Sequence, residues 1–114
     1  MKEVMIILRP KMYFKTKKAL VEAGFHSMTV KEIIGRGKKP IQYDMDQENG
    51  PTKHRLVAKR LIEMYVRDSD VDFLIETVVK INQTNHAGDG KIFVLPVKEA
   101  IRIRTNEKGN EAVI

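Results

Sequence analysis

Two segments with helical periodicity, each placed between two strand-like segments, constrain the fold of this 114-residue chain most strongly. Apolar side chains recur at helical spacing over residues 11–23, and Gly24 follows where a helix commonly ends. A second helix is expected after Asp68 or Ser69, either of which can cap it, and its stripe reaches Asn82. The expected strands are residues 4–8, 27–34, 56–66 and 91–95.

This order of elements predicts an α+β fold of the ferredoxin-like βαββαβ type, with both helices on one face of a four-stranded sheet. A chain of this length usually closes around one core, so residues 1–114 are expected to form a single domain. The other face of the sheet is not expected to be polar, because 4–8 and 92–95 are apolar without alternation. Burial of that face against copies of the same chain predicts a closed homo-oligomer.

The stretch between the two halves, residues 38–55, follows neither a helical nor a strand period. It contains two prolines, an Asn49-Gly50 turn signal and an acidic patch that includes Asp44 and Asp46. Loops of this length in small domains are generally either functional or disordered.

Composition and charge narrow the classes of protein. No cysteine is present, which excludes disulfides and thiolate chemistry, and the longest apolar run, 4–8, is too short to span a bilayer. A cytoplasmic protein outside the membrane is therefore expected. The net charge is +6, and residues 1–40 contain ten Lys and Arg against three acidic residues. Such asymmetry is compatible with a polyanionic partner; nucleic acid and a nucleotide triphosphate are two candidates, and composition alone does not choose between them.

Three clusters combine glycine or extended backbone with basic side chains. Residues 88–91 read Gly-Asp-Gly-Lys, which suits phosphate binding but also an ordinary tight turn. Arg102 and Arg104 would point to one side of an extended segment, as phosphate ligands or as a solvated edge strand. Residues 35–39 form a third cluster, or a flexible hinge. Three such clusters in one small domain favour an anion more than any one of them alone.

Catalytic and metal sites are poorly supported. His26, His54 and His86 lack metal-ligand spacing, so no metal site is predicted. No nucleophile elbow occurs, and no catalytic residue is assigned. No full Walker A motif is present, so a triphosphate would be held without hydrolysis machinery of that type. We therefore expect a protein that is not an enzyme.

Several blocks of residues, at their mutual spacing, carry a specific resemblance. They are residues 1–10, 19–24, 28–30, 35–38, 83–84, 88–94 and 101–105 with Glu107. On these blocks the sequence resembles the PII signal-transduction proteins, which are trimeric sensors of nitrogen status. The resemblance implies a ferredoxin-like trimer with ATP or ADP in clefts between subunits, and a long effector loop at 38–55 that contacts target proteins.

The resemblance also implies a role for each matching position. Next to the adenine would lie Ile7, Thr29, Glu63 and Tyr65. At the base of the loop, beside the nucleotide, would lie Gly35, Gly37, Lys38 and Lys39. Around the phosphates would lie Gly88, Asp89, Gly90 and Lys91, with Arg102 and Arg104 contributed from neighbouring chains. Lys59 matches the lysine that pairs with a carboxylate of 2-oxoglutarate.

Two departures from the family pattern refine these expectations. Members that bind 2-oxoglutarate through Mg²⁺ usually have glutamine where this chain has Lys39, and an ammonium group cannot coordinate Mg²⁺. Metal-bridged 2-oxoglutarate binding is therefore disfavoured. The loop also lacks the tyrosine-containing segment used for covalent modification, so no modification of Tyr43 is predicted.

The divergent loop on a standard body is most similar to the archaeal, nitrogenase-associated branch of the family. There a pair of PII-like proteins is encoded in the nitrogen-fixation gene cluster, and the present chain is most like the second. The resemblance implies nitrogenase as the protein target, and either a homotrimer or a mixed trimer with a sister PII-like protein.

Two other functions compete with this interpretation. The same fold order supports RNA-binding modules, which present aromatic side chains for base stacking. Aromatic residues are only 6% of this chain and Trp is absent, so no nucleic-acid partner is predicted. A metal-tolerance trimer of related fold would need metal ligands that the three histidines do not supply.

Overall fold

The computed structural model describes residues 1–37 and 56–114, so the predicted effector loop at 38–55, with Lys38 and Lys39, lies outside the described residues. The strands are β1 (Lys2–Leu8), β2 (Thr29–Gly35), β3 (Val57–Val66) and β4 (Lys91–Pro96). The helices are α1 (Tyr13–Glu22), α2 (Val71–Asn82) and the short α3 (Asn110–Val113). The 3₁₀ turns η1 (Pro10–Met12) and η4 (Asp68–Asp70) lead into α1 and α2.

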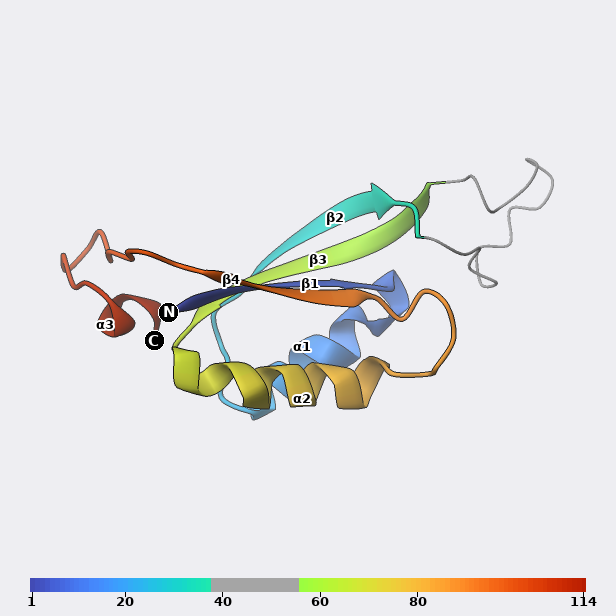
Figure 1. Cartoon of the computed structure of the whole chain (residues 1–114), viewed down its shortest axis with the longest axis horizontal. Coiled ribbons are helices and arrows are strands. Elements are labelled where there is room, and N and C mark those ends of the chain that lie inside the picture. Colours follow the sequence, from blue (N-terminus) through green and yellow to red (C-terminus); the bar gives the residue numbers. More distant parts are fainter. Residues whose placement is uncertain (38–55) are drawn as a thin grey trace.

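The four strands form one antiparallel sheet in the order β2-β3-β1-β4. The central strand β1 sets the register, because Ile6 lies opposite Ile62 on one side and opposite Ile92 on the other. Both α1 and α2 cover the same face of the sheet (Figure 1). The predicted α+β, ferredoxin-like arrangement is confirmed.

The hydrophobic core lies between the sheet and the two long helices. Alternate residues of β1 point into it, and Val4, Ile6 and Leu8 are almost completely buried. Leu20 of α1 and Leu74 of α2 close the core from the helix side. The predicted apolar stripes are therefore the buried faces of these helices.

No helix in the described part of the chain covers the opposite face of the sheet (Figure 1). The remaining residues of β1 point to this open face, where Phe93 lies opposite Met5 and Tyr65 opposite Glu3. Phe93 and Tyr65 are each 46% exposed. Apolar side chains are thus exposed on this face, as expected, beside charged ones such as Glu3, and the oligomer inferred from it remains a prediction.

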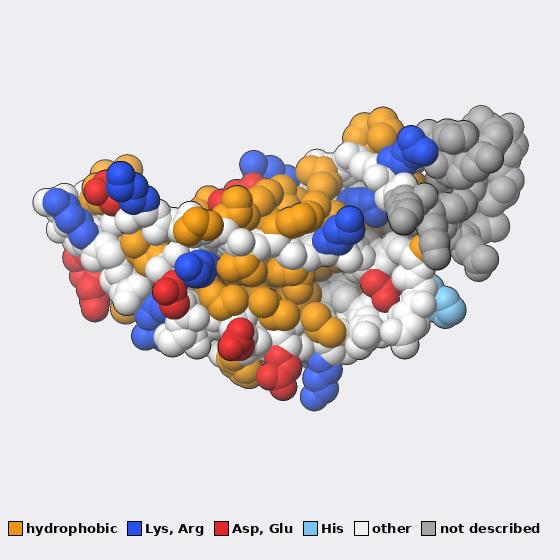
Figure 2. All heavy atoms as spheres, in the orientation of Figure 1, with side chains coloured by type: hydrophobic (Ala, Val, Ile, Leu, Met, Phe, Trp, Pro, Cys, Tyr) orange, Lys and Arg blue, Asp and Glu red, His pale blue; other side chains and the backbone are white. Residues whose placement is uncertain are grey.

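A second apolar surface follows the edge of the sheet. Figure 2 shows hydrophobic side chains gathered over β4 and between β4 and α2. The groove there is lined by Val79 of α2 together with Ile92 and Val94 of β4. The molecule therefore exposes apolar side chains both on the open face and along the β4 edge.

Two local expectations are wrong. No side-chain cap begins α2, which instead continues from η4, and Asp68 accepts a hydrogen bond from the amino-terminal nitrogen of Met1 at 2.7 Å. The segment around Arg102 and Arg104 is not extended, because the backbone N–H of Asn106 donates to the Arg102 carbonyl at 2.7 Å and closes a turn. Alternation over only four residues could not distinguish an extended segment from this turn.

Within residues 1–37 and 56–114, none of the helices combines the length and apolar character that crossing a bilayer requires.

Candidate functional site

Most of the predicted site residues that the structure describes border two hollows at opposite ends of the sheet. The glycine-loop hollow lies at the carboxyl end of β1 and is lined by Ile7, residues 35–37, Lys59, Gly88, Gly90, Lys91 and their neighbours. The tyrosine hollow lies at the other end and is lined by Thr29, Glu63, Tyr65, Ile101, Arg102 and residues near α3. Their volumes are about 510 and 720 Å³, within the range of about 300–1,000 Å³ typical of small-molecule pockets.

The glycine-loop hollow combines backbone and cationic groups. Gly88 and Gly90 have φ values of +100° and +112°, which side-chain-bearing residues rarely adopt. These glycines lead directly into Lys91, the first residue of β4. Glycine-rich backbone beside a lysine is the arrangement that phosphate-binding loops use, because N–H groups can approach an anion closely.

Lys59 of β3 contributes a second cation to this hollow. Its stem passes beside Gly35, since a Cβ atom at position 35 would be in ordinary van der Waals contact with Cδ of Lys59 at 3.6 Å. Burial lowers the pKa of Lys59 below its usual 10.5, and the positive charge of Arg9 lowers it further. An anion bound here would relieve the mutual repulsion of these two cations.

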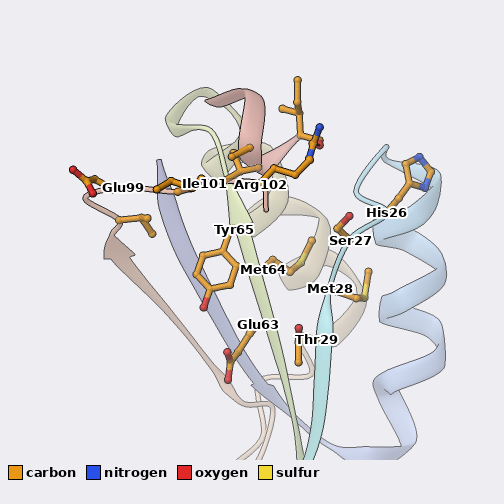
Figure 3. A pocket seen from close by; sticks show the side chains of 15 residues that line it. His26, Ser27, Met28, Thr29, Glu63, Met64, Tyr65, Glu99, Ile101 and Arg102 are labelled. Carbon is orange, nitrogen blue, oxygen red and sulfur yellow. The ribbon is translucent and has the colours of Figure 1, made fainter. Parts of the chain in front are cut away.

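The tyrosine hollow has hydrogen-bonding groups and an aromatic ring. Figure 3 shows Glu63 and Tyr65 on β3, with Thr29 on the neighbouring strand, where Thr29 lies directly opposite Glu63. The carboxylate of Glu63 forms an ion pair with Lys31, with 3.1 Å between Oε1 and Nζ. Tyr65 donates a hydrogen bond to Glu3 at 3.3 Å, and burial together with the charges of Glu3 and Glu63 raises its pKa. Such groups suit a planar, polar ring.

Arg102 closes the tyrosine hollow and is held by its own chain. Its guanidinium donates to a carboxylate oxygen of Glu107 at 2.7 Å and to the main-chain oxygen of Ile114 at 2.8 Å. A hydrogen bond from Thr105, assisted by Arg102, keeps the pKa of Glu107 below its usual value. Arg102 is thus fixed in position with much of its guanidinium already engaged.

One chain does not bring all the predicted residues together. Lys59 and Tyr65 lie six residues apart on β3, which corresponds to about 20 Å at a rise of about 3.3 Å per residue. The exposed Arg104 lies in the turn next to Arg102 and borders neither hollow. Ile7, Gly35, Gly37, Lys59, Gly88, Gly90 and Lys91 line the glycine-loop hollow, whereas Thr29, Glu63, Tyr65 and Arg102 line the tyrosine hollow.

Asp89 lies in the glycine loop, but its side chain does not line the glycine-loop hollow. Its carboxylate is instead directed toward its own loop, where Thr84 and Arg9 donate hydrogen bonds to it. Sequence reasoning missed Arg9 and Thr84. The signal available was an Asp between two glycines with a threonine five residues upstream, a pattern that favours side-chain-to-backbone hydrogen bonding within a loop.

Five residues that line the glycine-loop hollow were not assigned to the site from the sequence: Ile33, Ile34, Arg36, Ala87 and Phe93. Of these, Arg36 lies at the end of β2 and Phe93 in β4. Among the described residues, no group of three or more His, Asp or Glu side chains could hold a metal ion.

Comparisons with known proteins show which family the chain belongs to. The sequence pattern of the family described as "Nitrogen regulatory protein P-II" matches residues 1–107. The chain is 45% identical over 115 residues to "Nitrogen regulatory protein P-II 2" of Methanothermobacter thermautotrophicus, covering 99% of this chain and 97% of the relative. It is 40% identical over 123 residues to "Nitrogen fixation nifHD region GlnB-like protein 2" of Methanothermobacter marburgensis, covering 99% of this chain and all of the relative.

A solved structure shows the same architecture. The fold is similar to that of Arabidopsis thaliana PII bound to citrate, with a TM-score of 0.77 and 32% sequence identity. The likeness covers 98% of this chain and 88% of the plant chain. The family pattern matches residues 1–107, the archaeal relatives match along almost the whole chain, and the architecture is shared. The chain therefore belongs to the P-II family of nitrogen regulatory proteins.

Proposed function

We propose that this chain is a non-enzymatic sensor of nitrogen status that binds ATP or ADP between the subunits of a trimer. The phosphates would lie in the glycine-loop hollow, near Gly88, Gly90 and Lys91. The adenine would lie in the tyrosine hollow of the next subunit, near Thr29 and Glu63. Membership of the P-II family supports a regulatory role.

The observation that carries this proposal is the separation of two complementary half-sites. A nucleotide has a polyanionic end and a planar, polar ring, and the chain provides groups for each at opposite ends of its sheet. About 20 Å along β3 separates Lys59 from Tyr65, and the two hollows share no lining residue. The head-to-tail association of copies would place the two half-sites next to each other.

Ring closure follows from that kind of contact. A head-to-tail interface uses two different surfaces of each copy and closes into a ring when the rotation allows it. The open face of the sheet, with Phe93 and Tyr65 each 46% exposed, would be covered inside such a ring. Burial of apolar area is the main driving force of stable association.

A metabolite carboxylate is the second proposed ligand. Lys59 lies in the glycine-loop hollow, and the carboxylate of 2-oxoglutarate would offset the repulsion between Lys59 and Arg9. Lys39, at the base of the loop in the sequence, is not a ligand for Mg²⁺. We therefore propose that 2-oxoglutarate binds by charge pairing, without a bridging metal.

The output of the sensor is assigned to residues 38–55. Each ligand would favour a different set of conformations at the ends of this segment, in proportion to its differential affinity for them. The relatives named for the nifHD region support nitrogenase as the target. Both a homotrimer and a mixed trimer with a sister PII-like protein fit the head-to-tail contact.

Calorimetric titration of the purified protein with MgATP and ADP, each with and without 2-oxoglutarate, tests the ligands. We expect submillimolar binding of both nucleotides, and light scattering behind a size-exclusion column should give the mass of a trimer. Absence of nucleotide binding at millimolar concentration would refute the sensor assignment. For the target, nitrogenase should be retained by the immobilised protein, and the amount retained should change on addition of 2-oxoglutarate.

A further inference from the structure

The carboxylate of Asp89 is the centre of a hydrogen-bonded cluster inside the loop that precedes β4. Oδ2 accepts from the backbone N–H groups of Thr84 at 2.7 Å and Asn85 at 3.0 Å. Oδ1 accepts from the hydroxyl of Thr84 at 2.5 Å and from Nη1 of Arg9 at 2.6 Å. We call Arg9, Thr84, Asn85 and Asp89 the Asp89 cluster. Both oxygens of the carboxylate are therefore engaged within the protein.

Arg9 connects this cluster to the sheet. It directly follows the last residue of β1, and only 8% of its surface is exposed. Its Nη2 donates to the carbonyl oxygen of Ala87 at 2.8 Å, in addition to the bond from Nη1 to Asp89. The planar guanidinium thus holds the loop at two points, which a lysine could not do in the same geometry.

Thr84 is the second residue of the Asp89 cluster that connects distant parts of the loop. Its hydroxyl donates to Asp89 and also accepts from the backbone N–H of His86 at 3.2 Å. One hydroxyl thereby connects the start of the loop to its middle and to its end. A valine at this position has the same shape but makes neither bond.

The backbone that this cluster holds is conformationally expensive. Asn85 has a positive φ of 69°, which a residue with a side chain keeps only when surrounding contacts determine it, and Gly88 and Gly90, also at positive φ, are the residue type with the most backbone freedom to lose. The loop lies between α2 and β4, so no helix or strand ladder holds it. Hydrogen bonds to a charged group are stronger than those between neutral groups, and here several of them are accepted by the carboxylate of Asp89.

We propose that Thr84 and Arg9 are positioning residues that act through Asp89 to fix the backbone of residues 88–91 in its anion-binding shape before any ligand arrives. This inference rests on the proposed binding of nucleotide phosphates to that loop. Neither Thr84 nor Arg9 lines the glycine-loop hollow, so their effect on the ligand is indirect. A loop that is already ordered loses less conformational entropy on binding, and the affinity is correspondingly higher.

The matched pair Thr84→Val and Thr84→Ser tests this role in the full chain without changing any charge. The valine variant should bind MgATP roughly ten-fold more weakly than wild type, because about 1.4 kcal/mol corresponds to a factor of ten and one hydrogen bond to a charged group supplies about that much. The serine variant keeps the hydroxyl and should stay within about two-fold of wild type. Affinities are measured by calorimetric titration.

A second readout separates positioning from a general loss of structure. In the ligand-free protein, the backbone amide of Asn85, which donates to Asp89, should exchange with deuterium faster in Thr84→Val than in Thr84→Ser, while amides of the core strand β1 should not change. Arg9→Lys, which keeps the positive charge beside Lys59 but loses the two-point contact, should shift both readouts in the same direction as Thr84→Val.

The possible outcomes are distinct. If wild type does not bind MgATP, the proposed function fails and this inference fails with it. If wild type binds MgATP and Thr84→Val binds it equally well, the positioning role alone is wrong. Weaker binding without faster exchange at Asn85 would also overturn it, because the loop would then not have been held by the cluster.

Discussion

Gly90 lies so close to the backbone of β1 that a Cβ atom at position 90 would lie 1.9 Å from the carbonyl oxygen of Ile7. Real atoms do not approach so closely, and the obstacle is main chain, which cannot rotate away. Gly90 immediately precedes Lys91, which pairs with Ile7 in the register of β1 and β4. The close approach therefore places the glycine loop directly against the end of the central strand.

The first prediction is that Gly90→Ala strongly destabilises the protein, by more than about 2 kcal/mol, because strained backbone and a main-chain overlap add to each other. Gly24→Ala is the matched control, since Gly24 also has a positive φ of +101° but its added Cβ meets nothing within 4 Å. It should cost only about 1 kcal/mol. Urea unfolding at one fixed protein concentration measures both. Equal destabilisation would show that β1 and the loop do not approach as described.

The second prediction concerns the sharing of a site between subunits. Lys91→Met damages the glycine-loop half and Arg102→Met the tyrosine half, so a trimer of either variant alone should bind MgATP weakly. In a head-to-tail ring, a mixed trimer always contains one contact at which two undamaged halves meet. Co-expression of the two variants should therefore restore tight sites to about one per mixed trimer.

The restored sites are counted by calorimetric titration of the purified mixed trimers. Each variant taken alone through the same preparation is the control, and its tight sites should be absent. If one chain built the whole site, mixing could not help, and the mixed sample would bind no better than its two components. That outcome would remove the basis for a nucleotide site between subunits.

The order of elements could be predicted from the sequence because apolar periodicity reports directly which side of each element is buried. It even identified polar members of the core: Thr16 and Asn82 fall on the apolar stripes of α1 and α2, and both are buried. Such positions are recognisable because the helical period is independent of the chemistry of any one residue.

The arrangement of the site could not be predicted in the same way. Which residues of β3 share a hollow depends on strand register, and periodicity alone does not reveal that Leu61, rather than Tyr65, lies opposite Ile7. Likewise, Asp89 occurs in a phosphate-loop pattern, but only the folded loop shows its carboxylate turned toward Arg9 and Thr84. The sequence indicated the chemistry of these residues, and tertiary contacts decided which group each one faces.

The third prediction concerns the contact between α1 and α2. Nδ2 of the buried Asn82 donates to Oγ1 of Thr16 at 2.9 Å, and that hydroxyl donates to the carbonyl oxygen of Met12 at 2.7 Å. Thr16→Val leaves a buried donor without this acceptor, so the free energy of unfolding should fall by about 1–3 kcal/mol. Thr77→Val removes the same kind of helical bond, from Thr77 to Phe73, at a more exposed position and should cost less than about 1 kcal/mol.

Chemical denaturation of both variants checks the difference. If Thr16→Val proves no more destabilising than Thr77→Val, the hydrogen bond between the helices contributes nothing measurable to stability.

The fourth prediction is a pH dependence that originates in Asp89. Burial alone would raise the pKa of this carboxyl, but the hydrogen bonds from Thr84, Arg9 and Asn85 outweigh it and hold the pKa well below its usual 3.8. A carboxyl whose pKa is lower in the folded state stabilises the fold above the unfolded-state pKa, and that stabilisation disappears as the pH falls toward the folded-state pKa. In the variant Asp89→Asn the side chain cannot ionise, so this contribution to stability is absent at every pH.

The free energy of unfolding of wild type should exceed that of Asp89→Asn by a constant amount above about pH 5, and the difference should shrink steadily below about pH 4. Urea unfolding of both proteins across this range gives the difference directly, because the titration of all other carboxyls cancels in it. A constant difference down to about pH 3 would mean that the charge on Asp89 does not hold the loop.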